Sequence, residues 1–163
     1  MELIFIRHAE AQSGASYAED SLRTLTTRGR QVQEQVAKEL QRRGFSPDVV
    51  LSSPRLRAEQ TAWITTQVIS GDVPLIEVME LDGGFAVEDL LARLEAYLDC
   101  SCVTCVGHEP DMTFWTNSLL ANDEKQVSGF SNSMVVSLQF ERKPAIGKGV
   151  CNYIYTADAL LLE

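Results

Sequence analysis

Two arginines and two histidines stand where chemistry could take place, each just after a short apolar segment. These four residues are Arg7, His8, Arg55 and His108. The apolar segments before them are Leu3–Ile6, Val49–Leu51 and Val103–Val106. A short, uninterrupted apolar run is typical of a strand that is buried on both faces. Ligands of an open α/β sheet bind beyond the carboxyl ends of its strands, so the sequence predicts that the four side chains share one site.

Two arginines and two histidines in one crevice would form a site for an anion. Guanidinium groups match phosphate oxygens in a bidentate fork, which points to a phosphoryl group as the ligand. The chain has no glycine-rich Walker loop. Glu10, Glu109 and Asp111 lie near the histidines and make a two-histidine metal site conceivable, but the usual ligand spacing is missing. The pattern therefore favours a phosphoryl-transfer enzyme without metal or cofactor, in which a histidine is the covalent nucleophile.

The segments that position these residues alternate between strand and helix patterns. The expected strands are Leu3–Ile6, Val49–Leu51, Leu75–Met79, Val103–Val106, Met134–Phe140 and Val150–Thr156, the last two forming a hairpin. The expected helices are centred on residues 32–40, 54–69, 90–98 and 110–119. Thr26 or Thr27 is expected to N-cap the first helix and Ser53 the second, while Ala9–Leu25 reads as a polar loop. This order predicts a three-layer α/β/α fold with a mostly parallel sheet, in a single domain over residues 1–163.

Composition limits the partners. Asp and Glu number 23 against 14 Lys and Arg, giving a net charge of −9, which argues against binding to nucleic acid or to an anionic membrane. Residues 71–124 hold twelve acidic residues and one basic residue, so an anion site must be built locally. No apolar run is long enough to span a bilayer and no signal-peptide pattern is present, which favours a cytoplasmic location.

Two smaller sets of residues are expected to be structural. The cysteines should be reduced thiols, and Cys102 and Cys105 should point to opposite faces of one strand rather than bind metal. Trp63 and Trp115 lie in helical patterns and are expected in the core.

Four separated motifs together resemble the histidine phosphatase superfamily, which includes the phosphoglycerate mutases. The motifs are Arg7-His8-Ala9-Glu10, Leu25-Thr26-x-x-Gly29, Ser53-Pro54-Arg55-x-Arg57-Ala58-x-Gln60-Thr61-Ala62 and Val106-Gly107-His108. The short chain and the Arg-His-Ala form most resemble phosphohistidine phosphatases of the SixA type. The resemblance implies that His8 is the phosphorylated nucleophile and that Arg7, Arg55 and His108 bind the phosphoryl group.

These roles set further expectations. His8 must attack as a neutral imidazole with its other nitrogen held by a backbone carbonyl, whereas His108 is of more use as a cation. Many relatives carry an acidic proton donor after the second arginine motif, for which Glu80 is the best positional match, with Glu77 and Asp82 as competitors. Arg57 either lines the site or forms a surface ion pair, and helix geometry alone favours the surface.

The chain has little sequence to spare for a lid, and an open crevice could admit a phosphorylated side chain of another protein. The sequence therefore predicts a protein phosphohistidine phosphatase, with a histidine phosphotransfer domain of a signalling relay as substrate. An imidazole is a better leaving group than an alkoxide, so a weak or absent general acid is consistent with this substrate. Two alternatives remain open: a small-molecule phosphomonoesterase of the same superfamily, and a phosphate-binding module without turnover.

Overall fold

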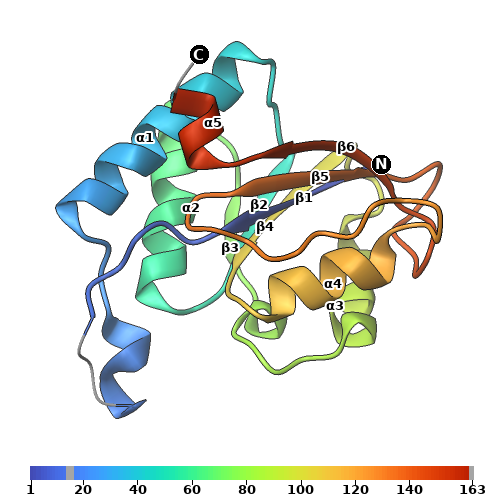
Figure 1. The fold of residues 1–163 in the computed structure, drawn as a ribbon, viewed down its shortest axis with the longest axis horizontal. Coiled ribbons are helices and arrows are strands. Elements are labelled where there is room, and N and C mark those ends of the chain that lie inside the picture. Colours follow the sequence, from blue (N-terminus) through green and yellow to red (C-terminus); the bar gives the residue numbers. More distant parts are fainter. Residues whose placement is uncertain (14–16, 162–163) are drawn as a thin grey trace.

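A computed structural model describes residues 1–13 and 17–161 and contains a six-stranded sheet with helices on both faces (Figure 1). The strands are β1 Glu2–Arg7, β2 Val49–Ser52, β3 Leu75–Glu77, β4 Cys102–Gly107, β5 Val135–Gln139 and β6 Val150–Tyr155. They are arranged in the order β3-β2-β4-β1-β5-β6. The first four in this order are parallel, and the antiparallel pair β5 and β6 extends the sheet beyond β1. The predicted fold, a mostly parallel sheet with a C-terminal hairpin, is confirmed.

Helices cover the two faces of the sheet unequally. The helices are α1 Thr27–Arg42, α2 Leu56–Ile69, α3 Val87–Leu94, α4 Asp111–Leu119 and α5 Ala157–Leu161. Figure 1 shows α1, α2 and α5 on one face and α3 and α4 on the other. Three short 3-10 helices complete the described elements: η1 Tyr17–Leu22, η2 Met79–Leu81 and η3 Glu95–Tyr97. None of the helices in the described ranges has the length and apolar character needed to cross a membrane.

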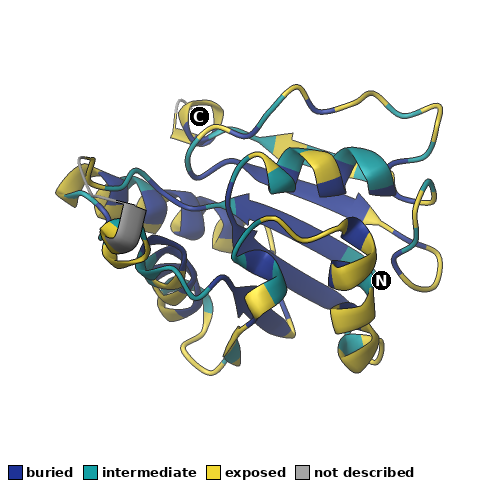
Figure 2. Ribbon diagram, turned by 90° about the horizontal axis from the view of Figure 1, so that it is seen from below, coloured by how far each residue is buried: buried dark blue, intermediate teal, exposed yellow. Residues whose placement is uncertain are grey.

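Alternation of side chains along the strands divides the core into two layers. Leu3 and Phe5 of β1 pack in the same cluster as Trp115 of α4, while Ile4 and Ile6 pack in the other cluster with α1 and α2. Figure 2 shows the result, with dark, buried strands and helices whose outer sides are exposed.

The cysteines follow the same alternation. Cys102 packs in the layer of α1 and α2, and Cys105 packs in the layer of α3 and α4. Both are free thiols, and burial raises their pKa values. The prediction that they point to opposite faces of one strand is confirmed.

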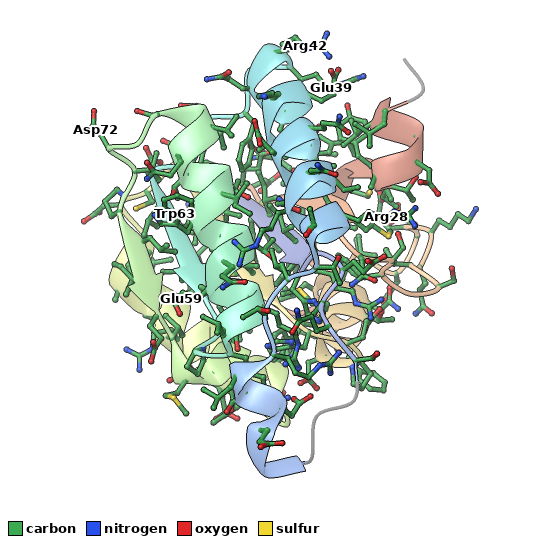
Figure 3. The ribbon with its side chains drawn as sticks, turned by 90° about the vertical axis from the view of Figure 1, so that its left-hand side faces the viewer. Arg28, Glu39, Arg42, Glu59, Trp63 and Asp72 are labelled. Atoms are coloured by element: carbon green, nitrogen blue, oxygen red, sulfur yellow. The ribbon has the colours of Figure 1, made fainter. Side chains whose placement is uncertain are left out.

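The structure differs from the sequence prediction in four elements. The expected loop Ala9–Leu25 contains η1, although its residues 14–16 lie outside the described part, and the short helix α5 follows the hairpin. The third strand ends at Glu77, where η2 soon follows. Helix α2 begins at Leu56 rather than Pro54, so Ser53 is not its N-cap. Trp63 is 55% exposed, on the outward side of α2 (Figure 3), so its assignment to the core was wrong.

The start of α1 is tied to the segment that follows the first histidine. Thr26 is its N-cap, as predicted: its hydroxyl oxygen accepts a hydrogen bond from the Gly29 N–H at 2.9 Å and donates one to a Glu10 carboxylate oxygen at 2.7 Å. A Cβ atom on Gly29 would lie 2.1 Å from the main-chain oxygen of Glu10. Glycine is therefore required here because the helix and the backbone after His8 touch.

Replacing Gly29 with alanine is expected to lower the free energy of unfolding by about 1–3 kcal/mol, the usual cost of overpacking. Urea unfolding measures this change. Gln35→Ala, on the exposed side of the same helix, is the matched control and should change stability by less than about 0.5 kcal/mol. Equal stability of the two variants would show that the contact with Glu10 relaxes without cost.

Candidate active site

The two histidines lie side by side because their strands are neighbours in the sheet. Arg7 of β1 is in register with Gly107 of β4, and the His8 N–H donates to the Gly107 carbonyl at 3.1 Å. The imidazole rings of His8 and His108 have centroids 5.1 Å apart and are tilted by 53°. Both side chains are buried, with 8% and 6% of their surface exposed. The structure therefore brings together the two histidines that the sequence placed at strand ends.

His8 is held in the tautomer that nucleophilic attack requires. Its Nδ1 lies 2.8 Å from the Ala9 carbonyl oxygen. Burial lowers the pKa of His8 to about 4, and the positive charges of Arg57 and Arg7 act in the same direction. A neutral ring must therefore carry its proton on Nδ1 to donate to that carbonyl, which leaves a lone pair on Nε2. The backbone carbonyl expected from the sequence is present, and Nε2 is the atom available for attack.

Arg57 lies inside the site, so the prediction that favoured the surface was wrong. Only 5% of Arg57 is exposed, and its Nε donates to Nε2 of His8 at 3.3 Å. The physical reason is that Arg57 lies on the buried side of α2, one turn before the buried Thr61, so its guanidinium reaches His8 rather than solvent. Its inclusion in the arginine motif was the signal in the sequence that could have identified it.

The other two arginines have different partners. Arg55 donates from Nε to Asp82 at 2.7 Å and from Nη1 to Asp20 at 2.8 Å. Although burial opposes it, hydrogen bonding to these carboxylates raises the pKa of Arg55. Arg7 donates from Nη1 to the Phe130 carbonyl at 2.6 Å, and its buried Nε has no partner among the described residues. Arg7 thus keeps a donor available for an anion, whereas the donors of Arg55 are mostly engaged.

The surroundings of His108 favour its neutral form in this structure, whereas the expectation from the sequence is that it is of more use as a cation. Burial lowers its pKa to about 2, with further contributions from His8 and the nearby arginines. Its Nε2 lies 2.8 Å from the Ser53 hydroxyl oxygen, while Nδ1 is buried without a partner in the described part of the chain. Ser53, expected as a helix cap, instead links His108 to the second arginine motif, since its oxygen also accepts from the Arg55 N–H at 3.2 Å.

Glu80, the best positional match for a proton donor, is paired with Arg93 and, within the described part of the chain, makes no hydrogen bond or ion pair with the histidines or the three arginines. Its two carboxylate oxygens accept hydrogen bonds from Nη2 and Nε of Arg93 at 2.9 and 3.1 Å. This pairing lowers the pKa of Glu80, which favours the ionised form and makes it a poor proton donor. The alternative proton donor, Asp82, contacts the site. Its carboxylate accepts a hydrogen bond from Arg55 and lies 3.5 Å from the Ser53 hydroxyl oxygen. Asp82 therefore fits the role of a residue of the site better than Glu80 does.

Several residues near the site hold the backbone in place. The Thr61 hydroxyl accepts from the Ala9 N–H at 3.0 Å, and Asn132 donates to the His8 carbonyl at 2.9 Å. Glu109 accepts a hydrogen bond from the Phe130 N–H, and so fixes the carbonyl that Arg7 contacts. Within the described ranges, no three His, Cys, Asp or Glu side chains gather where they could hold a metal ion. The surroundings of the histidines are thus built mainly from cationic and neutral donors.

The depressed histidine pKa values predict how stability depends on pH. The unfolded chain takes up protons near pH 6.5, whereas His8 resists protonation until about pH 4 and His108 until about pH 2. The unfolded state therefore binds more protons between these values, and the free energy of unfolding should fall as pH drops from 6.5 toward 4. Each histidine contributes up to about 1.4 kcal/mol per pH unit.

Urea unfolding between pH 4.5 and 7.5 measures this slope. The variant His108→Gln should lose about half of the histidine contribution, because one of the two groups no longer titrates. An unchanged slope in His108→Gln would contradict the assignment of a neutral His108.

The comparisons with known proteins agree with this geometry. The family model described as histidine phosphatase superfamily, branch 1, matches residues 3–99. An uncharacterised protein of Picosynechococcus sp. is 40% identical over 121 residues, 73% of each chain. The structure of the protein histidine phosphatase SixA complexed with tungstate has a TM-score of 0.85 at 26% identity, over 98% of this chain and 99% of that chain. The α-ribazole phosphatase of Shigella flexneri shares the fold, with a TM-score of 0.73 at 18% identity over 96% and 97% of the two chains. Since the family model covers more than half of its length, the chain belongs to the histidine phosphatase superfamily.

Proposed function

We propose that this chain is a phosphohistidine phosphatase that uses His8 as a covalent nucleophile and requires no metal ion. The observation that carries the proposal is the state of His8: Nδ1 is held by the Ala9 carbonyl, and Nε2 presents a lone pair next to Arg57. Nε2 attacks phosphorus while the P–N bond to the substrate imidazole breaks, and that imidazole takes its proton from solvent as it leaves. Water then cleaves the P–N bond on His8 and releases inorganic phosphate.

The carboxylates near the site favour an imidazole leaving group over an alkoxide. Asp20 and Asp82 both accept hydrogen bonds from guanidinium groups. Hydrogen bonding from Arg23 and Arg57 lowers the pKa of Asp20 to about 2, so Asp20 is ionised at neutral pH. A carboxylate in this state is a poor proton donor, and an alkoxide needs a proton more than an imidazole does. The site therefore suits phosphohistidine better than a phosphate ester.

The proposed substrate is a phosphorylated histidine on a protein, namely a histidine phosphotransfer domain of a signalling relay. The similarity to SixA, described as a protein histidine phosphatase, supports this class of substrate. A small-molecule phosphomonoesterase is the alternative, and the fold shared with an α-ribazole phosphatase is compatible with it.

One experiment separates these functions. The purified protein is incubated with a phosphorylated histidine phosphotransfer domain, with glycerate and sugar phosphates, and with α-ribazole phosphate, and phosphate release is followed. We expect turnover of the protein substrate and little turnover of the esters. Rapid hydrolysis of the esters alone would favour the phosphomonoesterase, and no turnover of any substrate would favour a binding module.

A further inference from the structure

A carboxylate of the protein itself lies between the two arginines that follow β2. One oxygen of Asp20, in η1, accepts hydrogen bonds from Nη1 of Arg55 at 2.8 Å and from Nη2 of Arg57 at 3.1 Å. The main-chain oxygen of Asp20 accepts a further hydrogen bond from Nη1 of Arg57 at 2.8 Å. The other carboxylate oxygen accepts from Arg23 at 2.8 Å. An anion is thus already bound by Arg57, which contacts the nucleophile, and by Arg55.

This arrangement engages the donors that a phosphoryl group would need. Arg57 donates from both Nη atoms to Asp20 and from Nε to Nε2 of His8, so Nε, Nη1 and Nη2 all have partners. The Nε–H of Arg57 also points at the lone pair that must attack phosphorus. A phosphoryl group bound to Nε2 would therefore have to replace at least one of these hydrogen bonds.

The tether of Asp20 makes it an effective competitor. A carboxylate carried on the same chain has an effective concentration of about millimolar or more, so a free monoanion of similar affinity cannot displace it at lower concentration. A phosphoryl dianion gains roughly twice the Coulomb attraction from the same two arginines. Competition from Asp20 thus raises the affinity that a ligand needs to occupy the site, and a phosphoryl dianion meets this requirement more readily than a monoanion.

Asp20 is also placed so that it can leave the arginines without disrupting the core. It is in a short 3-10 helix between β1 and α1, and its side chain is 27% exposed. Leu22 of the same element is 68% exposed and does not anchor it in the core. Its exit would therefore cost mainly the ionic hydrogen bonds described above.

We propose that Asp20 is a built-in competitor for the phosphoryl site, which weakens the binding of every oxyanion there by the same factor, so that only a strongly attracted ligand such as a phosphoryl dianion occupies the site. This inference rests on the proposed function only in taking a phosphoryl group as the ligand. If Asp20 only held Arg55 and Arg57 in place for the substrate, its removal would weaken phosphate binding, whereas removal of a competitor strengthens it.

Anion binding to the intact protein tests this without any need for turnover. Calorimetry at pH 7.5 measures the affinities for inorganic phosphate, mostly a dianion at this pH, and for formate, a monoanion that resembles the Asp20 carboxylate. In Asp20→Asn and in Asp20→Ala, phosphate is expected to bind about tenfold more tightly. In these variants phosphate no longer has to break a charge-assisted hydrogen bond between the Asp20 carboxylate and an arginine before it binds. Formate should gain by a similar factor in both variants, because in the wild type it has to displace the same carboxylate.

The control variant is Asp72→Asn, which removes the same charge from an exposed turn after α2 (Figure 3) and should leave both affinities unchanged. Phosphate binding that is equal to or weaker than wild type in both Asp20 variants, including no binding at all, would overturn the proposal. Tighter phosphate binding in a protein that hydrolyses no phosphohistidine would support the competitor role and contradict the proposed function instead.

Discussion

A protein in which His8 is replaced with alanine is expected to release phosphate at least about a thousandfold more slowly than the wild type, as is usual when a covalent nucleophile is removed. The reason is that Nε2 of His8 carries the lone pair that forms the new P–N bond, while its Nδ1 is committed to the Ala9 carbonyl. Initial rates with a phosphorylated histidine phosphotransfer domain measure the loss. Radiolabelled substrate should give an acid-labile phosphoprotein with the wild type and none with His8→Ala.

His108→Ala is the matched comparison, because it removes the neighbouring imidazole and keeps the nucleophile. This variant should still become labelled, although more slowly, since His108 contributes binding rather than the bond to phosphorus. Thermal denaturation of both variants checks that each is folded. Full activity of folded His8→Ala would refute covalent catalysis at this residue.

Replacing Arg57 with lysine is expected to reduce kcat/KM by about a hundredfold, although the charge is retained. A lysine presents a single ammonium group and cannot donate from a planar fork both to Nε2 of His8 and to the phosphoryl oxygens. Steady-state kinetics with the phosphorylated protein substrate measures the change. This measurement tests the role of Arg57, which was expected on the surface from the sequence alone.

Arg28→Lys is the control for this substitution, because Arg28 is an exposed arginine on α1 (Figure 3). It should retain wild-type kinetics. Wild-type activity in Arg57→Lys as well would mean that Arg57 supplies only charge, and that its hydrogen bond to His8 is dispensable.

Much of the site could be predicted because it depends on where strands end. Apolar runs identified β1, β2 and β4, and the residues after them include Arg7, His8, Arg55 and His108. The relation between strand ends and ligand sites is a property of the fold, so it needs no knowledge of side-chain contacts. The N-cap of α1 at Thr26 was predictable for a similar reason, because a hydroxyl side chain before an apolar helical stripe is a local signal.

The remaining features depend on contacts between distant segments, which local patterns do not encode. The inward direction of Arg57 follows from how α2 packs, since Arg57 shares the buried side of this helix with Thr61 and Thr65. The ion pair of Glu80 with Arg93, and the low pKa of the buried His108, depend on how other elements pack around them. The role of Asp20 was missed for the same reason, since Arg55 and Arg57 follow α1 in the sequence, whereas Asp20 precedes it.

The pairing of β1 with β4 also bears on how the active site forms during folding. Residue 2 pairs with residue 102, and the same register continues to residues 7 and 107. Contacts so far apart in the sequence close a long loop, which is slow compared with helix formation. The two histidines can therefore meet only after the central sheet has assembled, and a refolding protein should regain phosphate binding with the slow phase that forms β4. A nascent chain would likewise have no site until about two thirds of its residues had been synthesised.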